Sequence, residues 1–192
     1  MKNYIYLFRH TQSTDNEHNI FSGDRKDINL SEAGKREAQR LREKLKDYKF
    51  EVAIASPLKR SVETLDIVLE EYHPNVERIV DERIKERDYG ILEGRVKQKV
   101  AIPILNIWAN IAHRSYVIPP PGGENFIQVW NRVMPFVHDL EDMIRQRKVN
   151  VAICGHNNSM RPIRAYFEHK TPRQMLKENS EHGVIYEYEI DT

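Results

Sequence analysis

The feature that most constrains the fold of this chain is the alternation of short apolar runs with stretches of helical periodicity. Apolar, β-rich runs occupy residues 4–8, 52–55 and 149–154, and helical spacing follows at about 32–47, 62–72 and 160–167. Residues 126–144 form a further helical pattern, with Pro135 as a candidate bend, and residues 184–190 alternate as a late edge strand would. This order predicts an α/β fold: a three-layer sandwich with a mostly parallel central sheet flanked by helices.

The length of the chain and one irregular segment bound its organisation. With 192 residues the chain is close to the usual size of one domain, and we expect residues 1–192 to form a single domain. Residues 94–123 show no clear periodicity and end in three prolines and two glycines. Long irregular stretches in compact domains are usually functional, so we expect a lid or substrate loop over about 95–123.

The composition excludes several classes of protein. The 30 basic and 29 acidic side chains give a net charge of +1, without the basic excess of a nucleic-acid-binding protein. No apolar run approaches the roughly 20 residues of a membrane helix, and the N-terminus lacks the features of a signal peptide. We therefore expect a cytoplasmic protein that binds neither nucleic acid nor membrane, while a homo-oligomer stays compatible with the sequence. The single cysteine, Cys154, excludes an internal disulfide and is expected to be a core residue.

Basic and imidazole side chains follow the expected strands at the points where these end. The first strand leads to Arg9 and His10, the second to Arg60, and the third to His156 and Asn158. Ligands of parallel α/β sheets bind outside the carboxyl ends of the strands, so these residues should converge. Such a concentration of positive charge favours a dianionic phosphoryl group. The sequence therefore predicts a phosphate pocket.

His10 has two candidate roles in such a pocket, nucleophile or general base. Glu86 lies on an expected turn, where it could protonate a leaving oxygen, and this favours His10 as the nucleophile. Arg9, Arg60 and His156 would then stabilise the equatorial oxygens of the transferring phosphoryl group. This chemistry needs no metal ion, and we expect none.

Several motifs extend this pattern along the chain in a fixed order. They are LFRHTQSTDN at residues 7–16, FSG at 21–23, LSEAG at 30–34, SPLKR at 56–60, ERDYGILEG at 86–94, GE at 123–124 and GHNNSMR at 155–161. The ordered set resembles the histidine phosphatase superfamily, also called the phosphoglycerate mutase-like family. The resemblance implies that His10 is the phosphorylated histidine, that Arg9 and Arg60 bind phosphate, that His156 is the second histidine and that Glu86 donates the proton. It places Asn16, Ser22, Gly23 and Asn158 in the substrate pocket.

Two residues depart from the pattern of this family. Thr11 and Asn157 stand where the family usually has a glycine after each of its two histidines. Glycine allows a close backbone approach and unusual dihedral angles, so both replacements are candidates for narrowing the pocket. The charged groups are intact.

The sequence leaves three functions open. A phosphatase acting on small phosphorylated metabolites, without a cofactor, comes first because the short proline-glycine crossing resembles that of the family's phosphatases. A phosphoglycerate mutase, with 2,3-bisphosphoglycerate as phosphoryl primer, follows closely, because Lys97 and Arg114 resemble two substrate-clamping residues of such enzymes. A non-catalytic phosphate-binding module is the third alternative, prompted by Thr11 and Asn157.

The remaining candidates receive a structural interpretation. Ser159 is expected to cap a helix, and we expect Trp108 and Trp130 to be a lid and a core aromatic residue respectively. Six histidines are interpreted as surface or packed residues: His18, His73, His113, His138, His169 and His182.

Overall fold

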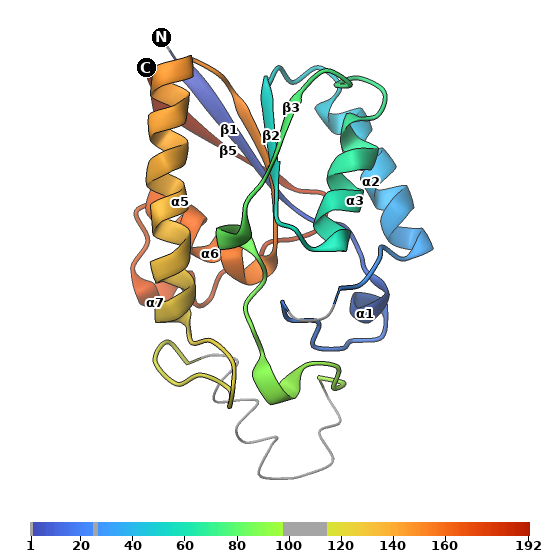
Figure 1. Ribbon diagram of the computed structural model, residues 1–192, viewed down its shortest axis with the longest axis vertical. Coiled ribbons are helices and arrows are strands. Elements are labelled where there is room, and N and C mark those ends of the chain that lie inside the picture. The colour runs from blue at the N-terminus through green and yellow to red at the C-terminus, as the bar shows by residue number, and fades with distance from the viewer. Residues whose placement is uncertain (1, 25–26, 98–114) are drawn as a thin grey trace.

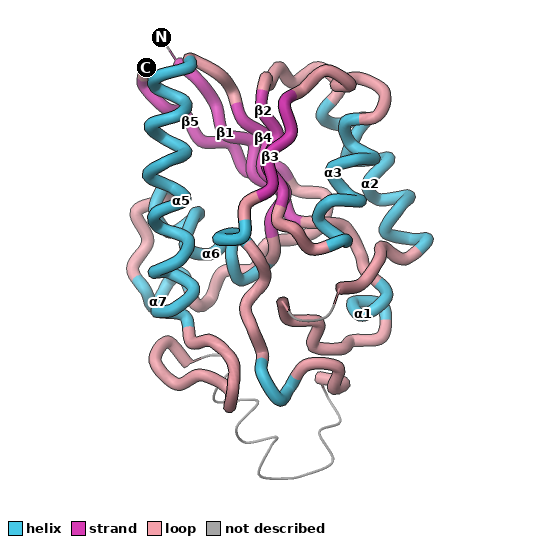
Figure 2. The backbone as a smooth tube through the Cα atoms, viewed as in Figure 1, coloured by secondary structure: helices cyan, strands magenta, loops and turns pink. Residues whose placement is uncertain are grey.

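A five-stranded sheet forms the centre of the protein, as the computed structural model shows over residues 2–24, 27–97 and 115–192 (Figures 1 and 2). Its strands are β1 (Lys2–Arg9), β2 (Val52–Ala55), β3 (Glu77–Val80), β4 (Val151–Gly155) and β5 (Ile185–Asp191), in the order β3-β2-β4-β1-β5. The first four strands pair in parallel, and β5 pairs with β1 in antiparallel register. The predicted mostly parallel sheet is confirmed, with the late strand at its edge.

Helices cover both faces of this sheet. They are α1 (Thr14–Glu17), α2 (Glu32–Leu45), α3 (Lys59–Leu69), α5 (Phe126–Arg147), α6 (Asn157–Phe167) and α7 (Pro172–Met175), with 3-10 turns η1 (Glu82–Ile84) and η2 (Gly90–Leu92). Alternate residues of β1 enter separate cores: Ile5 and Leu7 pack toward α5 and α6, whereas Tyr6 and Phe8 pack toward α2 and α3. The expected three-layer sandwich is therefore confirmed (Figure 1).

One strand differs from the expectation. The edge strand β3 was not predicted, because its residues are largely exposed and begin with Glu77 and Arg78, so no apolar alternation marks it. Charged side chains are a common way to protect a sheet edge. The helix predicted over residues 126–144 is confirmed as α5, which contains Pro135 within its 22 residues.

The start of α2 brings the loop after β1 close to the sheet. Ser31 caps this helix by accepting a hydrogen bond from Gly34 N at 3.1 Å. A Cβ atom added at Gly34 would lie only 1.9 Å from the carbonyl oxygen of Gln12, so glycine allows the loop after His10 to rest directly on the helix.

Part of the expected lid cannot be placed. Residues 98–114, which include Trp108, His113 and Arg114, lie outside the described residues. Among the residues that are described, no helix is both long and apolar enough to cross a membrane.

Candidate active site

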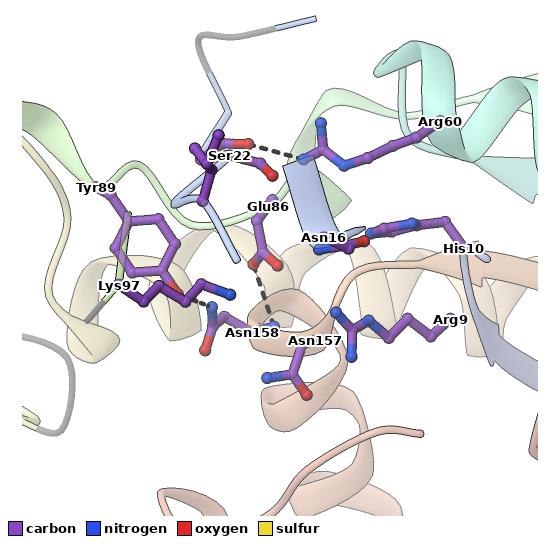
Figure 3. Close-up of a pocket in the computed structure, with 12 residues that line it drawn as sticks. Arg9, His10, Asn16, Ser22, Arg60, Glu86, Tyr89, Lys97, Asn157 and Asn158 are labelled. Atoms are coloured by element: carbon purple, nitrogen blue, oxygen red, sulfur yellow. Dashed lines mark hydrogen bonds between the residues drawn. The ribbon is translucent and has the colours of Figure 1, made fainter. Parts of the chain in front are cut away.

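A cavity of about 60 Å³ lies beyond the carboxyl end of β1, where loops from several elements meet (Figure 3). Its described lining residues are Arg9, His10, Asn16, Ile20, Ser22, Gly23, Arg60, Glu86, Tyr89, Lys97, Asn157 and Asn158. Drug-sized ligands occupy pockets of roughly 300–1,000 Å³, so this space suits a small group such as a phosphoryl. Nine of the residues predicted for the site are thus brought together. His156 is not among the lining residues, and Arg114 lies outside the described residues.

His10 presents one ring nitrogen to this cavity. Its Nδ1 lies 2.7 Å from the carbonyl oxygen of Thr11, which can only accept, so Nδ1 carries the proton. The ring points into the cavity, and Nε2 has no hydrogen-bond partner among the described residues (Figure 3). Burial, then the nearby His156 and Arg60, hold the pKa of His10 well below its usual 6.5. The side chain is therefore a neutral imidazole with an available Nε2 lone pair.

Thr11 takes part in a chain of hydrogen bonds behind His10. Its backbone N donates to Oγ1 of Thr64 at 3.1 Å, and Thr64 Oγ1 donates to the carbonyl oxygen of Arg60 at 2.7 Å. Thr11 is fully buried and is not a lining residue of the cavity. The threonine side chain that stands in place of glycine adds a contact of its Oγ1 with Thr64 Oγ1 at 3.3 Å, behind His10, and does not narrow the pocket.

Asn157 does line the cavity, at the first position of α6. Its Oδ1 accepts a hydrogen bond from Ser180 N at 2.8 Å. Asn157 has a negative φ, so its backbone needs no glycine. The second departure from the family pattern instead ties α6 to the segment that leads into β5.

Arg9 and Arg60 supply the positive charge of the cavity. Arg60 is 1% exposed on α3 and donates from Nη2 to the carbonyl oxygen of Gly23 at 2.7 Å. Arg9 donates from Nη1 to the carbonyl oxygen of Ser180 at 3.1 Å, while its buried Nε has no partner within the described residues. Burial lowers the pKa of both guanidinium groups from 12.5. An anion in the cavity would compensate this desolvation.

Glu86 contributes a carboxyl group to the cavity and is 8% exposed. Its Oε1 accepts hydrogen bonds from Arg87 N at 2.8 Å and from Asn158 N at 3.1 Å. Because both donors occupy Oε1, a proton on this carboxyl group would reside on Oε2. Glu86 therefore has the geometry of a proton donor with one fixed and one available oxygen.

Arg132 of α5 holds the segment that carries Glu86. Its Nη1 donates to the carbonyl oxygen of Arg83 at 2.6 Å, and its Nη2 donates to that of Glu86 at 3.2 Å. Nε of Arg132 is in turn paired with Glu124 at 2.8 Å. Sequence reasoning missed Arg132, because its helix position shows only an amphipathic pattern.

His156 lies next to His10 but is not a lining residue of the cavity. The two ring centroids lie 4.9 Å apart, and His156 is fully buried at the end of β4. Its Nε2 lies 2.6 Å from Oγ of Ser56, and its Nδ1 has no partner in the described part of the chain. Burial, followed by Arg60, keeps the pKa of His156 well below 6.5. In this structure His156 contacts the ring of His10 rather than the cavity.

His182 also lies next to His10, although the sequence suggested only a surface or packed histidine. The two ring centroids are 5.7 Å apart, and burial, with Arg9 next, lowers the pKa of His182 to about 4. No sequence signal marked this contact, because 172 positions separate the two residues.

The other predicted pocket residues that line the cavity are Asn16, Ser22, Gly23 and Asn158. Asn16 caps α1 through Oδ1, which accepts from Ser13 N at 3.2 Å, and Ser22 Oγ is buried without a partner in the described residues. Gly23 has a φ of +61°, and a Cβ atom there would lie 1.7 Å from Oε1 of Glu93. Asn158 donates from Nδ2 to the hydroxyl of Tyr89 at 2.7 Å.

One group of carboxylates could in principle hold a cation. Among the described residues, Asp24, Asp88 and Glu93 bring three ligand oxygens within 4.8 Å of one another. Two of the three already accept backbone hydrogen bonds: Glu93 Oε1 from Tyr89 N at 3.1 Å and from Asp24 N at 3.2 Å, and Asp88 Oδ1 from Gly90 N at 2.6 Å; the carboxylate of Asp24 lies 3.5 Å from Lys85 Nζ. These carboxylates brace the loops around the cavity.

Two structural interpretations are confirmed near the site. Burial raises the pKa of the Cys154 thiol to about 12, as befits an inert core residue. Oγ of Ser159 accepts a hydrogen bond from His156 N at 3.2 Å and so caps α6.

Comparisons with known proteins find a matching family model and similar sequences. The model of the histidine phosphatase superfamily (branch 1) matches residues 5–192. A 2,3-bisphosphoglycerate-dependent phosphoglycerate mutase of Brucella melitensis is 35% identical over the whole of this chain and 94% of its own length.

Solved structures show the same fold at lower identity. The alpha-ribazole phosphatase of Shigella flexneri superposes with a TM-score of 0.81 at 21% identity, over 96% of this chain and 89% of its own. A mycobacterial glucosyl-3-phosphoglycerate phosphatase gives a TM-score of 0.80 at 19% identity, over 98% and 91%.

Proposed function

The chain belongs to the histidine phosphatase superfamily, and we propose that it hydrolyses small phosphomonoesters through a phosphohistidine at His10. The relatives in this superfamily are phosphatases and phosphoglycerate mutases, and the chain is accordingly an enzyme of one of these two types. The observation that carries the proposal is the hydrogen bond from His10 Nδ1 to Thr11 O at 2.7 Å, which leaves a neutral Nε2 at the wall of a cationic cavity.

In the first step, the Nε2 lone pair of His10 forms a bond to phosphorus as the ester P–O bond breaks. The leaving oxygen takes a proton from Oε2 of Glu86, which becomes a carboxylate. Positive charge develops on the imidazole and is stabilised by the hydrogen bond from Nδ1 to Thr11 O. Arg9 and Arg60 stabilise the negative charge on the equatorial oxygens.

In the second step, a water molecule attacks the phosphorus of phosphohistidine. Its oxygen forms the new P–O bond, the P–Nε2 bond breaks with its electrons returning to the ring, and the Glu86 carboxylate accepts the proton of the water. Inorganic phosphate leaves, and Glu86 is again protonated. Neither step calls on a metal ion or a cofactor.

The proline-glycine crossing supports hydrolysis over isomerisation. The carbonyl oxygen of Pro121 accepts from Ile91 N at 3.1 Å, and Glu124 N donates to Asp88 O at 2.9 Å. A Cβ atom at Gly90 would lie 2.1 Å from Pro121 O, so the crossing rests on the turn after Glu86. None of residues 119–123 is among the described lining residues of the cavity, so the crossing itself adds no cover to the phosphate site.

Phosphoglycerate mutase activity is the second candidate. It is favoured by the 35% identity to the Brucella enzyme and by Lys97 at the cavity, which could hold a substrate carboxylate. This activity would require 2,3-bisphosphoglycerate to prime His10. A non-catalytic phosphate-binding module would bind phosphate but turn over neither substrate.

The test is a phosphoenzyme assay coupled to product analysis. Brief reaction with an aryl phosphate should give an acid-labile, alkali-stable phosphoprotein in the wild type and in His18→Ala, which removes an exposed histidine, but not in His10→Ala. With 3-phosphoglycerate, with and without 2,3-bisphosphoglycerate, released phosphate indicates the phosphatase and 2-phosphoglycerate without free phosphate the mutase. Full activity of His10→Ala would overturn the mechanism, and no turnover at all would favour the binding module.

A further inference from the structure

A second and larger cavity adjoins the phosphate cavity. It measures about 660 Å³ and shares Arg9, Lys97 and Asn157 with the smaller one. Its own walls come from α6 and from α7 with the turn after it, and α7 packs against α6 through Met175 and Ala165. A molecule whose phosphate occupies the small cavity would therefore extend into this space.

The walls of the second cavity are strongly cationic. Of its nine described lining residues, five are cations: Arg9, Lys97, Arg161, Arg173 and Lys177. The one carboxylate, Glu178, is already paired with two cations that do not line the cavity. Arg164 Nη2 lies 2.7 Å from its Oε2, and Lys170 Nζ lies 2.6 Å from its Oε1. The cavity thus carries a positive charge that its own walls do not neutralise.

Arg161 of α6 is the buried member of this set. It is 6% exposed, and its buried Nε has no hydrogen-bond partner among the described residues. The guanidinium lies 5.1 Å from the ring centroid of Phe126, and burial lowers its pKa from 12.5. A buried donor without a partner is costly, so this group favours an anionic ligand at the cavity wall.

Arg173 and Lys177 form the exposed side of the cavity. Both side chains are exposed, and neither has an ion pair within the described residues. Arginine can bind phosphate through two parallel hydrogen bonds, and lysine adds a point charge. Together with Arg161 they give the site three positive charges, which matches a dianionic phosphate better than a carboxylate with a single negative charge.

We propose that this second cavity binds a second anionic group of the substrate, and that the preferred substrate is a small molecule with phosphate at both ends. The group at the His10 end is the one transferred, so this inference rests on the proposed function. The second phosphate contacts Arg161, Arg173 and Lys177. A neutral tail of the same length leaves these cations unpaired and binds more weakly.

The test uses three linear substrates of equal chain length. They are hexane-1,6-diol bisphosphate, 6-phosphonooxyhexanoate and 6-hydroxyhexyl phosphate, so the far end is a phosphate, a carboxylate or a hydroxyl. We expect kcat/KM for the bisphosphate to exceed that for the hydroxyl compound by about tenfold or more, with the carboxylate between them. Equal values for all three would overturn the inference, and a carboxylate ahead of the bisphosphate would overturn the choice of phosphate.

A double variant assigns the preference to this cavity. In Arg173→Gln/Lys177→Gln, the ratio of kcat/KM between bisphosphate and hydroxyl substrate should fall to within about threefold of unity, mainly through a higher KM for the bisphosphate. Arg40→Gln/Lys46→Gln, which removes two exposed cations at the far side of α2, is the matched control and should keep the wild-type ratio. A ratio that persists in Arg173→Gln/Lys177→Gln would overturn the assignment.

A binding measurement separates this inference from the proposed function. Hexane-1,6-bisphosphonate and hexylphosphonate cannot be hydrolysed, and their affinities can be measured by calorimetry whether or not the protein is a phosphatase. Tighter binding of the bisphosphonate, lost in Arg173→Gln/Lys177→Gln, supports the second site even if no substrate is turned over. Equal affinities for the bisphosphonate and hexylphosphonate, together with normal hydrolysis of substrates, would contradict the second site but not the proposed phosphatase activity.

Discussion

Nδ1 of His182 donates a hydrogen bond to the backbone carbonyl oxygen of His10 at 2.7 Å. The contact exists because the segment before β5 lies next to the end of β1, where Arg9 and His182 form an isolated bridge. His10, the proposed nucleophile, is therefore held from two sides: its ring by Thr11 O and its backbone by His182. His182 contacts His10 but is not itself a lining residue of the cavity, so we assign it a positioning role.

Replacement of His182 should lower the rate of phosphorylation. His182→Ala removes one neutral hydrogen bond worth about 0.5–1.5 kcal/mol, so we expect kcat/KM to fall about 2- to 10-fold. His182→Asn should recover most of this loss, because an amide NH₂ can donate from nearly the same position. The measurement is single-turnover formation of the phosphoenzyme, with His138→Ala as control. Equal losses in His182→Ala and His182→Asn would show that the hydrogen bond is not what matters.

The pH dependence of activity should reflect the buried state of His10. An exposed histidine nucleophile would lose activity as pH falls through about 6.5. Burial, with His156 and Arg60 nearby, holds the pKa of His10 well below this value, so its imidazole stays neutral as the pH falls from 7.5 through 6.5. We therefore expect kcat/KM for an aryl phosphate, corrected for ionisation of the substrate, to stay flat over this range. A midpoint near 6.5 in the corrected profile would contradict a buried neutral nucleophile.

Removal of the proton donor should affect substrates according to their leaving group. Glu86→Gln keeps an oxygen to accept from Asn158 N and Arg87 N, but it supplies no transferable proton. Alkyl phosphates, whose leaving oxygen must be protonated, should lose about 10²–10⁴-fold in kcat, whereas activated aryl phosphates should lose far less. The measurement is the rate for a series of aryl phosphates whose leaving groups differ in pKa. The rate should depend more steeply on leaving-group pKa in Glu86→Gln than in the wild type. An equal loss across the series would indicate a structural role for Glu86.

The main architecture could be predicted from the sequence, because its signals are local. Buried strands such as Val52–Ala55 are continuous apolar runs, and Ser31 marks the start of a helix by its own chemistry. Arg9, His10 and Arg60 follow directly after, or within a few residues of, the strands that position them. Strand β3 (Glu77–Val80) could not be predicted in this way, because its side chains are largely exposed and show no apolar alternation.

The supporting residues of the site could not be predicted because they act over long sequence separations. Thr64 bonds the backbone N of Thr11 across 53 positions, and Arg132 reaches Glu86 O across 46. Neither residue is unusual on its helix, so only the fold reveals the contact. Thr11 and Asn157 were the anomalies visible in the sequence, and their side chains contact the distant Thr64 and Ser180 respectively.

Glu93 should make the stability of the protein depend on pH near neutrality. Burial, with Asp88 and Asp24 nearby, raises the pKa of Glu93 from 4.5 to about 7, against two backbone hydrogen bonds that lower it. Between these values the folded protein holds a proton that the unfolded chain has released. The contribution of Glu93 to stability is therefore fully present below pH 4.5 and is lost as pH rises through about 7.

Thermal unfolding of the wild type and of Glu93→Gln tests this linkage. Glutamine does not titrate, so the Tm of the wild type should fall relative to that of Glu93→Gln as pH rises from 5 to 8, and the difference should stop changing above this range. Release of one proton changes the free energy of unfolding by at most about 1.4 kcal/mol per pH unit. Because Glu93 is only half-buried, we expect a smaller dependence of the free energy of unfolding on pH. Glu181→Gln, at an exposed carboxylate, is the matched control and should track the wild type. A constant difference between wild type and Glu93→Gln from pH 5 to 8 would mean that Glu93 is ionised throughout, with its two backbone hydrogen bonds outweighing burial.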